Sequence, residues 1–117
     1  MITKIEKPWG YEIIWAKTGT YIGKILHIKA GHRLSKQYHQ KKDETVYVLD
    51  GTLYNYDGQN TLKKICKGES FHVIPQQIHR FCAEDEDVTL VEVSTHQIDD
   101  VIRLDDDYGR RDDNSST

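Results

Sequence analysis

The chain has few cysteines, prolines and methionines, and it has no long apolar run. Its 117 residues include two Cys, two Pro and one Met. Cys66 and Cys82 could in principle form a disulfide, but in a cytosolic chain we expect two reduced thiols that are buried in or near strands. The apolar stretches are too short to cross a bilayer. Residues 1–15 carry charges and a proline where a signal peptide needs an apolar core, which favours a cytoplasmic protein.

The chain also lacks an excess of positive charge. Its formal net charge is -3, and no cluster of Lys and Arg is large enough to follow a nucleic-acid backbone. We therefore expect a small-molecule partner and neither a nucleic acid nor a membrane. The length fits one domain. We expect this domain to span residues 1–111, with an Asp-rich C-terminal arm at 97–111 and a disordered tail at 112–117.

Short segments rich in β-branched and aromatic residues recur along the chain, separated by turn signals such as Asp50-Gly51 and Lys67-Gly68. No stretch of ten residues sustains the apolar period of a helix. This pattern predicts an all-β sandwich or barrel. The expected strands are 11–16, 21–29, 44–50, 52–56, 71–74 and 88–94.

Polar residues occur on strand faces that alternation assigns to the interior. Glu44 shares a face with Val46 and Val48, and Gln37 shares one with His39. Because a buried polar group is costly unless something satisfies it, these positions are the first indication of a site.

The spacing of these residues indicates a metal site. The segment from Gly31 to Gly51 reads G-x5-Q-x-H-x4-E-x6-G, and His79 follows a second glycine-led strand. Gln37 and His39 project from one face, and a short connection can return Glu44 beside them. Two imidazoles, a carboxylate and an amide oxygen suit a first-row divalent metal. The alternative is that the histidines are hydrogen-bonded strand residues and that Glu44 is a surface acid.

Two motifs in the chain resemble those of the cupin superfamily. The first cupin motif is G-x5-H-x-H-x3,4-E-x6-G, with Gln37 here in place of the first His. The second matches in length from Gly68 to His79, with Ile74, Gln76 and Ala83 at positions where the family has other residues. Residues 31–39 (GHRLSKQYH) and 7–12 (KPWGYE) are similar to the mannose-6-phosphate isomerase-type (type II) small cupins.

This resemblance implies a single-domain double-stranded β-helix, also called a jelly-roll barrel. It also implies one divalent metal ion (Zn, Mn, Fe, Ni or Co), with Gln37, His39, Glu44 and His79 as its ligands.

Other residues are candidates for substrate and catalytic roles. Lys24 and Arg33 share the inward parity; they are candidate catalytic residues and are expected to hold a phosphate or carboxylate. Arg80 has the outward parity and is a weaker candidate. Tyr47 and His72 are candidates to line the pocket, and His72 is a candidate base.

For function, the resemblance implies metal-dependent action on a sugar phosphate or nucleotide sugar, with aldose–ketose isomerisation as the leading hypothesis. Two alternatives stay open, a non-catalytic sugar-binding module and an Fe(II) oxygenase, because this fold carries several chemistries. Exposed β segments at both ends of the chain predict a homodimer.

Overall fold

The computed structural model describes residues 2–110, and every regular element within them is a β-strand. This confirms the all-β class. No helix in this range is long and apolar enough to cross a membrane. The strands are β1 (Thr3–Lys7), β2 (Gly10–Lys17), β3 (Tyr21–Ile28), β4 (Lys36–Tyr38), β5 (Glu44–Asp50), β6 (Leu53–Tyr56), β7 (Leu62–Ile65), β8 (Ser70–Val73), β9 (Arg80–Cys82), β10 (Val88–Thr95) and β11 (Ile102–Asp105).

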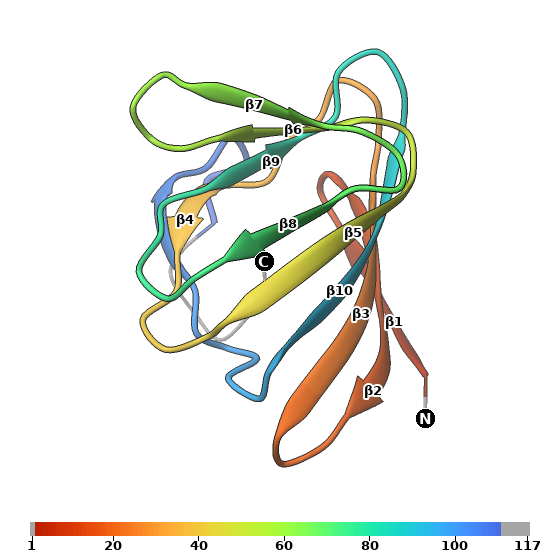
Figure 1. Cartoon of the computed structure of the whole chain (residues 1–117), viewed down its shortest axis with the longest axis vertical. Coiled ribbons are helices and arrows are strands. Elements are labelled where there is room, and N and C mark those ends of the chain that lie inside the picture. Colours follow the sequence, from red (N-terminus) through yellow and green to blue (C-terminus); the bar gives the residue numbers. More distant parts are fainter. Residues whose placement is uncertain (1, 111–117) are drawn as a thin grey trace.

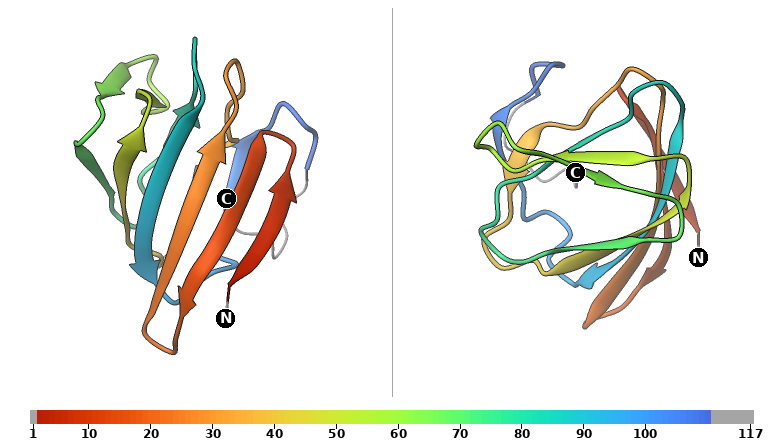
Figure 2. Two further views of the ribbon diagram at one scale, coloured as in Figure 1. Left: turned by 90° about the vertical axis from the view of Figure 1, so that its right-hand side faces the viewer. Right: turned by 45° about the horizontal axis from the view of Figure 1, so that its top comes forward.

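The strands form two opposed antiparallel layers (Figure 1). One layer is a six-stranded sheet in the order β1-β2-β3-β10-β5-β8. The other layer contains the sheet β7-β6-β9 and the pair β11-β4. Two isolated β-bridges join this sheet to this pair, one between Arg33 and Cys82 and one between Gln37 and His79. Figure 2 shows the strands of the two layers wrapping around a common interior. This is the jelly-roll barrel that the sequence predicted.

The expected strands correspond to β2, β3, β5, β6, β8 and β10, each within two residues of its predicted ends. Alternation along them supplies the core, as in β10, where Val88 and Leu90 are fully buried and Val93 is exposed. The core cluster consists of Trp9, Leu26, Ile28, Leu34, Val46, Val48, Leu53, Ile65, Val73, Phe81, Ala83, Val88 and Leu90.

Gly10, the first residue of β2, lies very close to the neighbouring strand β3. Its φ is 153°, and a Cβ at this position would collide with the carbonyl oxygen of His27 on the neighbouring strand. A glycine therefore allows β2 to approach β3 closely. The preceding residue, Trp9, is fully buried in the core.

Both cysteines are free thiols. Cys82 is buried in β9, as expected, whereas Cys66 is exposed, contrary to the expectation, because it lies directly after β7, whose residues are mostly exposed. The C-terminal arm contributes β11, which pairs with β4. The tail expected at 112–117 lies outside the described residues.

Candidate metal centre

Three of the side chains selected from the sequence meet inside the barrel. His39 follows β4, Glu44 begins β5 and His79 precedes β9. Glu44 Oε1 lies 2.7 Å from His39 Nε2 and 3.7 Å from His79 Nε2. All three side chains are at most 2% exposed, and one ligand atom from each lies within 4.8 Å of the others. This arrangement suits a divalent metal ion.

The backbone explains why these residues meet. Gln37 and His79 exchange two backbone hydrogen bonds of 2.9 Å, so their strands lie side by side. His39 is two residues beyond Gln37 and therefore points to the same interior face. Glu44 begins β5 in the opposite sheet and faces them across the interior.

Backbone carbonyls orient the two imidazole rings. His39 Nδ1 lies 2.5 Å from the carbonyl oxygen of Asp100, and His79 Nδ1 lies 3.1 Å from that of Gln77. Because a carbonyl oxygen only accepts hydrogen bonds, each Nδ1 carries a proton. Each Nε2 is then directed toward Glu44, and this is how proteins commonly fix metal-binding histidines.

Gln37, the fourth ligand expected from the sequence, has a side-chain oxygen without a hydrogen-bond partner among the described residues. Its side chain is fully buried, and its Nε2 donates to Ser35 Oγ over 2.8 Å. Its Oε1 has no hydrogen-bond partner among the described residues. A buried acceptor without a partner is costly, so an ion beside the His–Glu–His group would satisfy it. His39, Glu44 and His79 therefore fit a divalent metal ion, and Gln37 Oε1 is the candidate for a fourth ligand.

The electrostatics of the group favour its ligand forms. Burial alone would raise the pKa of Glu44, but Lys42 and the two imidazoles hold that pKa well below its usual value. Burial lowers the pKa of His79 to about 4. Glu44 is thus a carboxylate and His79 is a neutral imidazole at neutral pH, as metal binding requires.

A chain of buried charges extends from the metal group into the barrel. Lys42 Nζ lies 3.3 Å from Glu92 Oε2 and 4.0 Å from Glu44 Oε2. Lys24 Nζ lies 3.0 Å from Glu12 Oε2, and these side chains are fully buried. Burial, and then the charge of Glu44, raise the pKa of Glu92 to about 7. Glu92 is therefore a buried carboxyl group that is more readily protonated than an ordinary glutamate.

Sequence reasoning overlooked Glu92, Lys42 and Glu12. Glu92 shares the inward face of β10 with Val88 and Leu90. The same parity that selected Glu44 could therefore have found it. Lys42 lies in the irregular connection before β5, where no strand alternation predicts its burial.

The remaining candidates lie in different places. Lys24 is inside the barrel, as its parity predicted. Tyr47 is 45% exposed on the outer face of β5. His72 is exposed, and its Nε2 lies 2.6 Å from Asp43 Oδ1. Tyr47 and His72 therefore do not face the metal group.

Arg33 lies on the outer surface, in contrast to its expected inward parity. The regular strand β4 begins only at Lys36, and Leu34 takes the inward position instead. The guanidinium groups of Arg33 and Arg80 both donate to Asp107. Since Arg80 directly follows His79, these cations lie on the opposite side of the sheet from the metal group.

The C-terminal segment is fastened beside the metal group. The Asp100 carboxylate accepts the backbone N–H groups of Gln40 (3.0 Å), Lys41 (2.7 Å) and Lys42 (2.9 Å). Beyond it, β11 places Arg103 opposite Gln37. Asp100 thus fixes the loop that joins His39 to Glu44.

Comparison with known proteins identifies one family. The sequence model of the family described as "Mannose-6-phosphate isomerase C-terminal" matches residues 1–106. No curated protein matches the chain.

Solved structures with similar folds have very different sequences. A cupin-like protein from Thermotoga maritima superposes with a TM-score of 0.73 and 15% identity, over 82% of this chain and 76% of that chain. The polyketide cyclase RemF from Streptomyces resistomycificus gives 0.76 and 11%, over 88% and 80%. The capsular polysaccharide assembling protein CapF from Staphylococcus aureus gives 0.73 and 14%, over 90% of this chain and 34% of that chain. These similarities show the cupin fold, and the differing names of the proteins show that the fold alone does not indicate a reaction.

Proposed function

The chain belongs to the mannose-6-phosphate isomerase C-terminal family of cupin-type domains, and from this premise we propose that it is a metal-dependent enzyme acting on a sugar phosphate or nucleotide sugar. The proposed reaction is an aldose–ketose isomerisation. The observation that carries the proposal is the buried group of His39, Glu44 and His79, with the unpartnered Oε1 of Gln37 in the same interior.

These four residues would hold the metal, which we propose to be Zn, Mn, Fe, Ni or Co. When bound, such an ion acts as a Lewis acid toward carbonyl and hydroxyl oxygens. The protein must then supply a group that moves a proton between neighbouring carbons.

Glu92 is our candidate for this proton transfer. It is buried in the same interior, and its pKa is raised to about 7. Lys42, 3.3 Å away, stabilises the ionised form of Glu92 after it gives up its proton. Lys24, on the strand beside β10, is a second buried lysine and is paired with Glu12. His72 and Arg33 have no part in this proposal because both lie outside the barrel.

The first test is metal content, measured by mass spectrometry on protein purified without a His-tag. We expect near-stoichiometric metal in the natural chain and none in a His39→Ala, His79→Ala double variant. The absence of metal from both, even after incubation with excess Zn, Mn, Fe or Ni, would overturn the proposal.

The second test is turnover of sugar phosphates by the metal-loaded protein. Glu92→Gln should retain its metal and lose at least about 100-fold in kcat, the size of a general acid–base effect. Glu86→Gln changes an exposed carboxylate and is the matched control. Equal kcat values for Glu92→Gln and Glu86→Gln would eliminate Glu92 as the proton-transfer residue.

The closed environment of the metal group favours a second candidate, a non-catalytic module that binds a sugar or nucleotide sugar. The three side chains are at most 2% exposed, and closed coordination is typical of structural metal sites, whereas catalytic sites keep an open position. Saturable binding of sugar phosphates without product over long incubation would support this candidate. Two histidines and one carboxylate also suit Fe(II), so oxygen uptake by the iron-loaded protein would support an oxygenase.

We further propose that the protein forms a homodimer through the outer face of the six-stranded sheet, which faces the viewer in the left panel of Figure 2. Large apolar side chains are exposed on this face, a common feature of protein interfaces. They are Trp15, Tyr21, Tyr47, Leu49 and Val93. Sedimentation velocity should give a dimer for the natural chain and a monomer for Val93→Glu, and a monomeric natural chain would refute this interface.

A further inference from the structure

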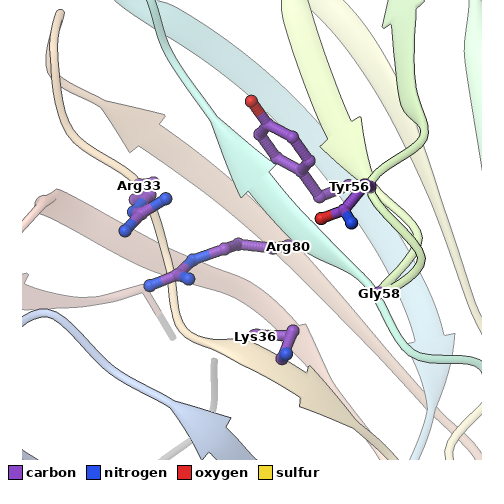
Figure 3. Close-up of a pocket in the computed structure, with 6 residues that line it drawn as sticks. Arg33, Lys36, Tyr56, Gly58 and Arg80 are labelled. Atoms are coloured by element: carbon purple, nitrogen blue, oxygen red, sulfur yellow. The ribbon is translucent and has the colours of Figure 1, made fainter.

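A hollow on the outer face of the second layer collects three positive charges. Its volume is about 250 Å³, and its lining residues are Arg33, Lys36, Tyr56, Gly58, Asn60 and Arg80. Figure 3 shows the ends of the Arg33, Lys36 and Arg80 side chains gathered on one side, with Tyr56 directed away from them. The residues come from β4 and the segment before it, from β6 and the loop after it, and from β9.

The two guanidinium groups are occupied by carboxylates of the chain itself. Arg33 donates from Nε (2.7 Å) and Nη2 (2.9 Å) to Asp107, in a two-pronged pair. Arg80 donates from Nη2 to Asp107 and from Nη1 to Asp105, each over 3.1 Å. Its Nε donates to the carbonyl oxygen of Leu34, which fixes the plane of the guanidinium. Two guanidinium groups converging on one acid are also the arrangement that binds phosphate.

Among residues 2–110, the charges at this hollow do not balance. Arg33, Lys36 and Arg80 contribute three positive charges, whereas Asp105 and Asp107 contribute two negative ones. Within residues 2–110, no carboxylate pairs with Lys36. The Arg80 side chain is only 6% exposed, so it requires an anion in any state of the protein. A phosphate dianion supplies the same charge as the two aspartates and also suits the vacant Lys36.

We propose that this hollow is an anion-binding site for a phosphate-bearing small molecule, which competes with Asp105 and Asp107 for the two arginines. The site is separate from the metal group, because His79 and Arg80 are consecutive residues that point to opposite faces of their strand. The proposal therefore does not depend on the reaction proposed for the interior.

The test is calorimetric titration of the full chain with inorganic phosphate in a chloride buffer. The double variant Asp105→Asn, Asp107→Asn removes the competing carboxylates and should tighten phosphate binding about ten-fold. The reason is that Arg33 and Arg80 are then free to bind phosphate in a larger fraction of the molecules. Lys36→Gln should weaken binding about three-fold, the effect of one exposed charge pair. Lys67→Gln, an exposed lysine paired only with Asp50 among the described residues, should bind phosphate like the natural chain.

The His39→Ala, His79→Ala double variant separates this site from the metal centre. It should lose metal yet bind phosphate with unchanged affinity. Loss of phosphate binding in this variant would place the anion at the metal group and overturn the inference. Equal affinities in the natural chain, the double asparagine variant and Lys36→Gln would also overturn it, and melting temperatures would confirm that each variant is folded.

Discussion

Asp100 offers a direct test of how the C-terminal segment supports the metal group. Its carboxylate accepts three backbone N–H groups over 2.7–3.0 Å, and its carbonyl oxygen holds His39 Nδ1. Replacing Asp100 with Ala leaves the N–H groups of residues 40–42 without their charged acceptor. Hydrogen bonds to charged groups each contribute about 1.5–3 kcal/mol, less where water can replace the acceptor. Two of these three residues are exposed, so we expect Asp100→Ala to lower the free energy of unfolding by about 2–4 kcal/mol.

This effect should depend on pH. Burial alone would raise the pKa of Asp100, but the three N–H donors bring it below its ordinary value. A carboxyl group with a lowered folded pKa stabilises the protein fully above its unfolded pKa, which is about 3.9. That stability is lost as the pH falls through the folded pKa. The difference between the natural chain and Asp100→Ala should therefore be constant from pH 7 to 5 and shrink below about pH 4.

Urea unfolding at several pH values measures this difference. Asp100→Asn keeps one acceptor oxygen without the charge and should recover part of the lost stability. Asp99→Asn is the control, because the exposed side chain of Asp99 makes no hydrogen bond or ion pair within the described residues. A loss below about 0.5 kcal/mol in Asp100→Ala, or a loss of equal size at pH 7 and pH 2, would refute the reasoning.

Three further predictions concern other parts of the barrel. A Cβ at Gly23 would lie 2.5 Å from Cζ2 of Trp15, so Gly23→Ala should displace the indole ring. We expect the free energy of unfolding to fall by about 1 kcal/mol and the tryptophan fluorescence to shift. An unchanged fluorescence spectrum would contradict this. Glu92→Leu removes the anion 3.3 Å from buried Lys42 and should cost about 3–5 kcal/mol by urea unfolding, whereas a neutral result would mean that the pair is not buried as described. Cys66 should react rapidly with a thiol reagent in the native protein, while Cys82, whose pKa burial raises to about 11, should react only after unfolding; equal rates would refute the difference in exposure.

The sequence patterns predicted β2, β3, β5, β6, β8 and β10 but not the other strands. In β3, β5 and β10, which are seven or eight residues long, buried positions recur at every second residue over most of the strand, so both the element and its inward face could be predicted. The segments that became β7 and β9 gave no such signal. In β7, Leu62 and Lys63 are exposed and only Ile65 is buried, and β9 is three residues long and buried throughout. Both depend on pairing with β6, which the local sequence does not encode.

Counting alternate residues along a strand predicted the inward position of Glu44 correctly and that of Arg33 wrongly. The difference is that Glu44 lies in a regular strand and Arg33 does not. Glu44 opens a strand of seven residues in which Val46 and Val48 are fully buried, so counting by twos from the valines reaches it correctly. Between Arg33 and Gln37 the chain is not a regular strand, and Leu34 and Gln37 are both buried although they are three residues apart. Counting by twos across that irregularity puts Arg33 on the wrong side.

The same irregularity separates the two sets of charges in this molecule. Because Leu34 turns inward, Arg33 turns outward and meets Arg80 and the aspartates of the C-terminal segment. The interior positive charges are then Lys24 and Lys42, each beside a buried glutamate. Because His79 and Arg80 point to opposite faces of their strand, the hollow at Arg33 and Arg80 and the metal group at His39, Glu44 and His79 lie on opposite sides of the second layer.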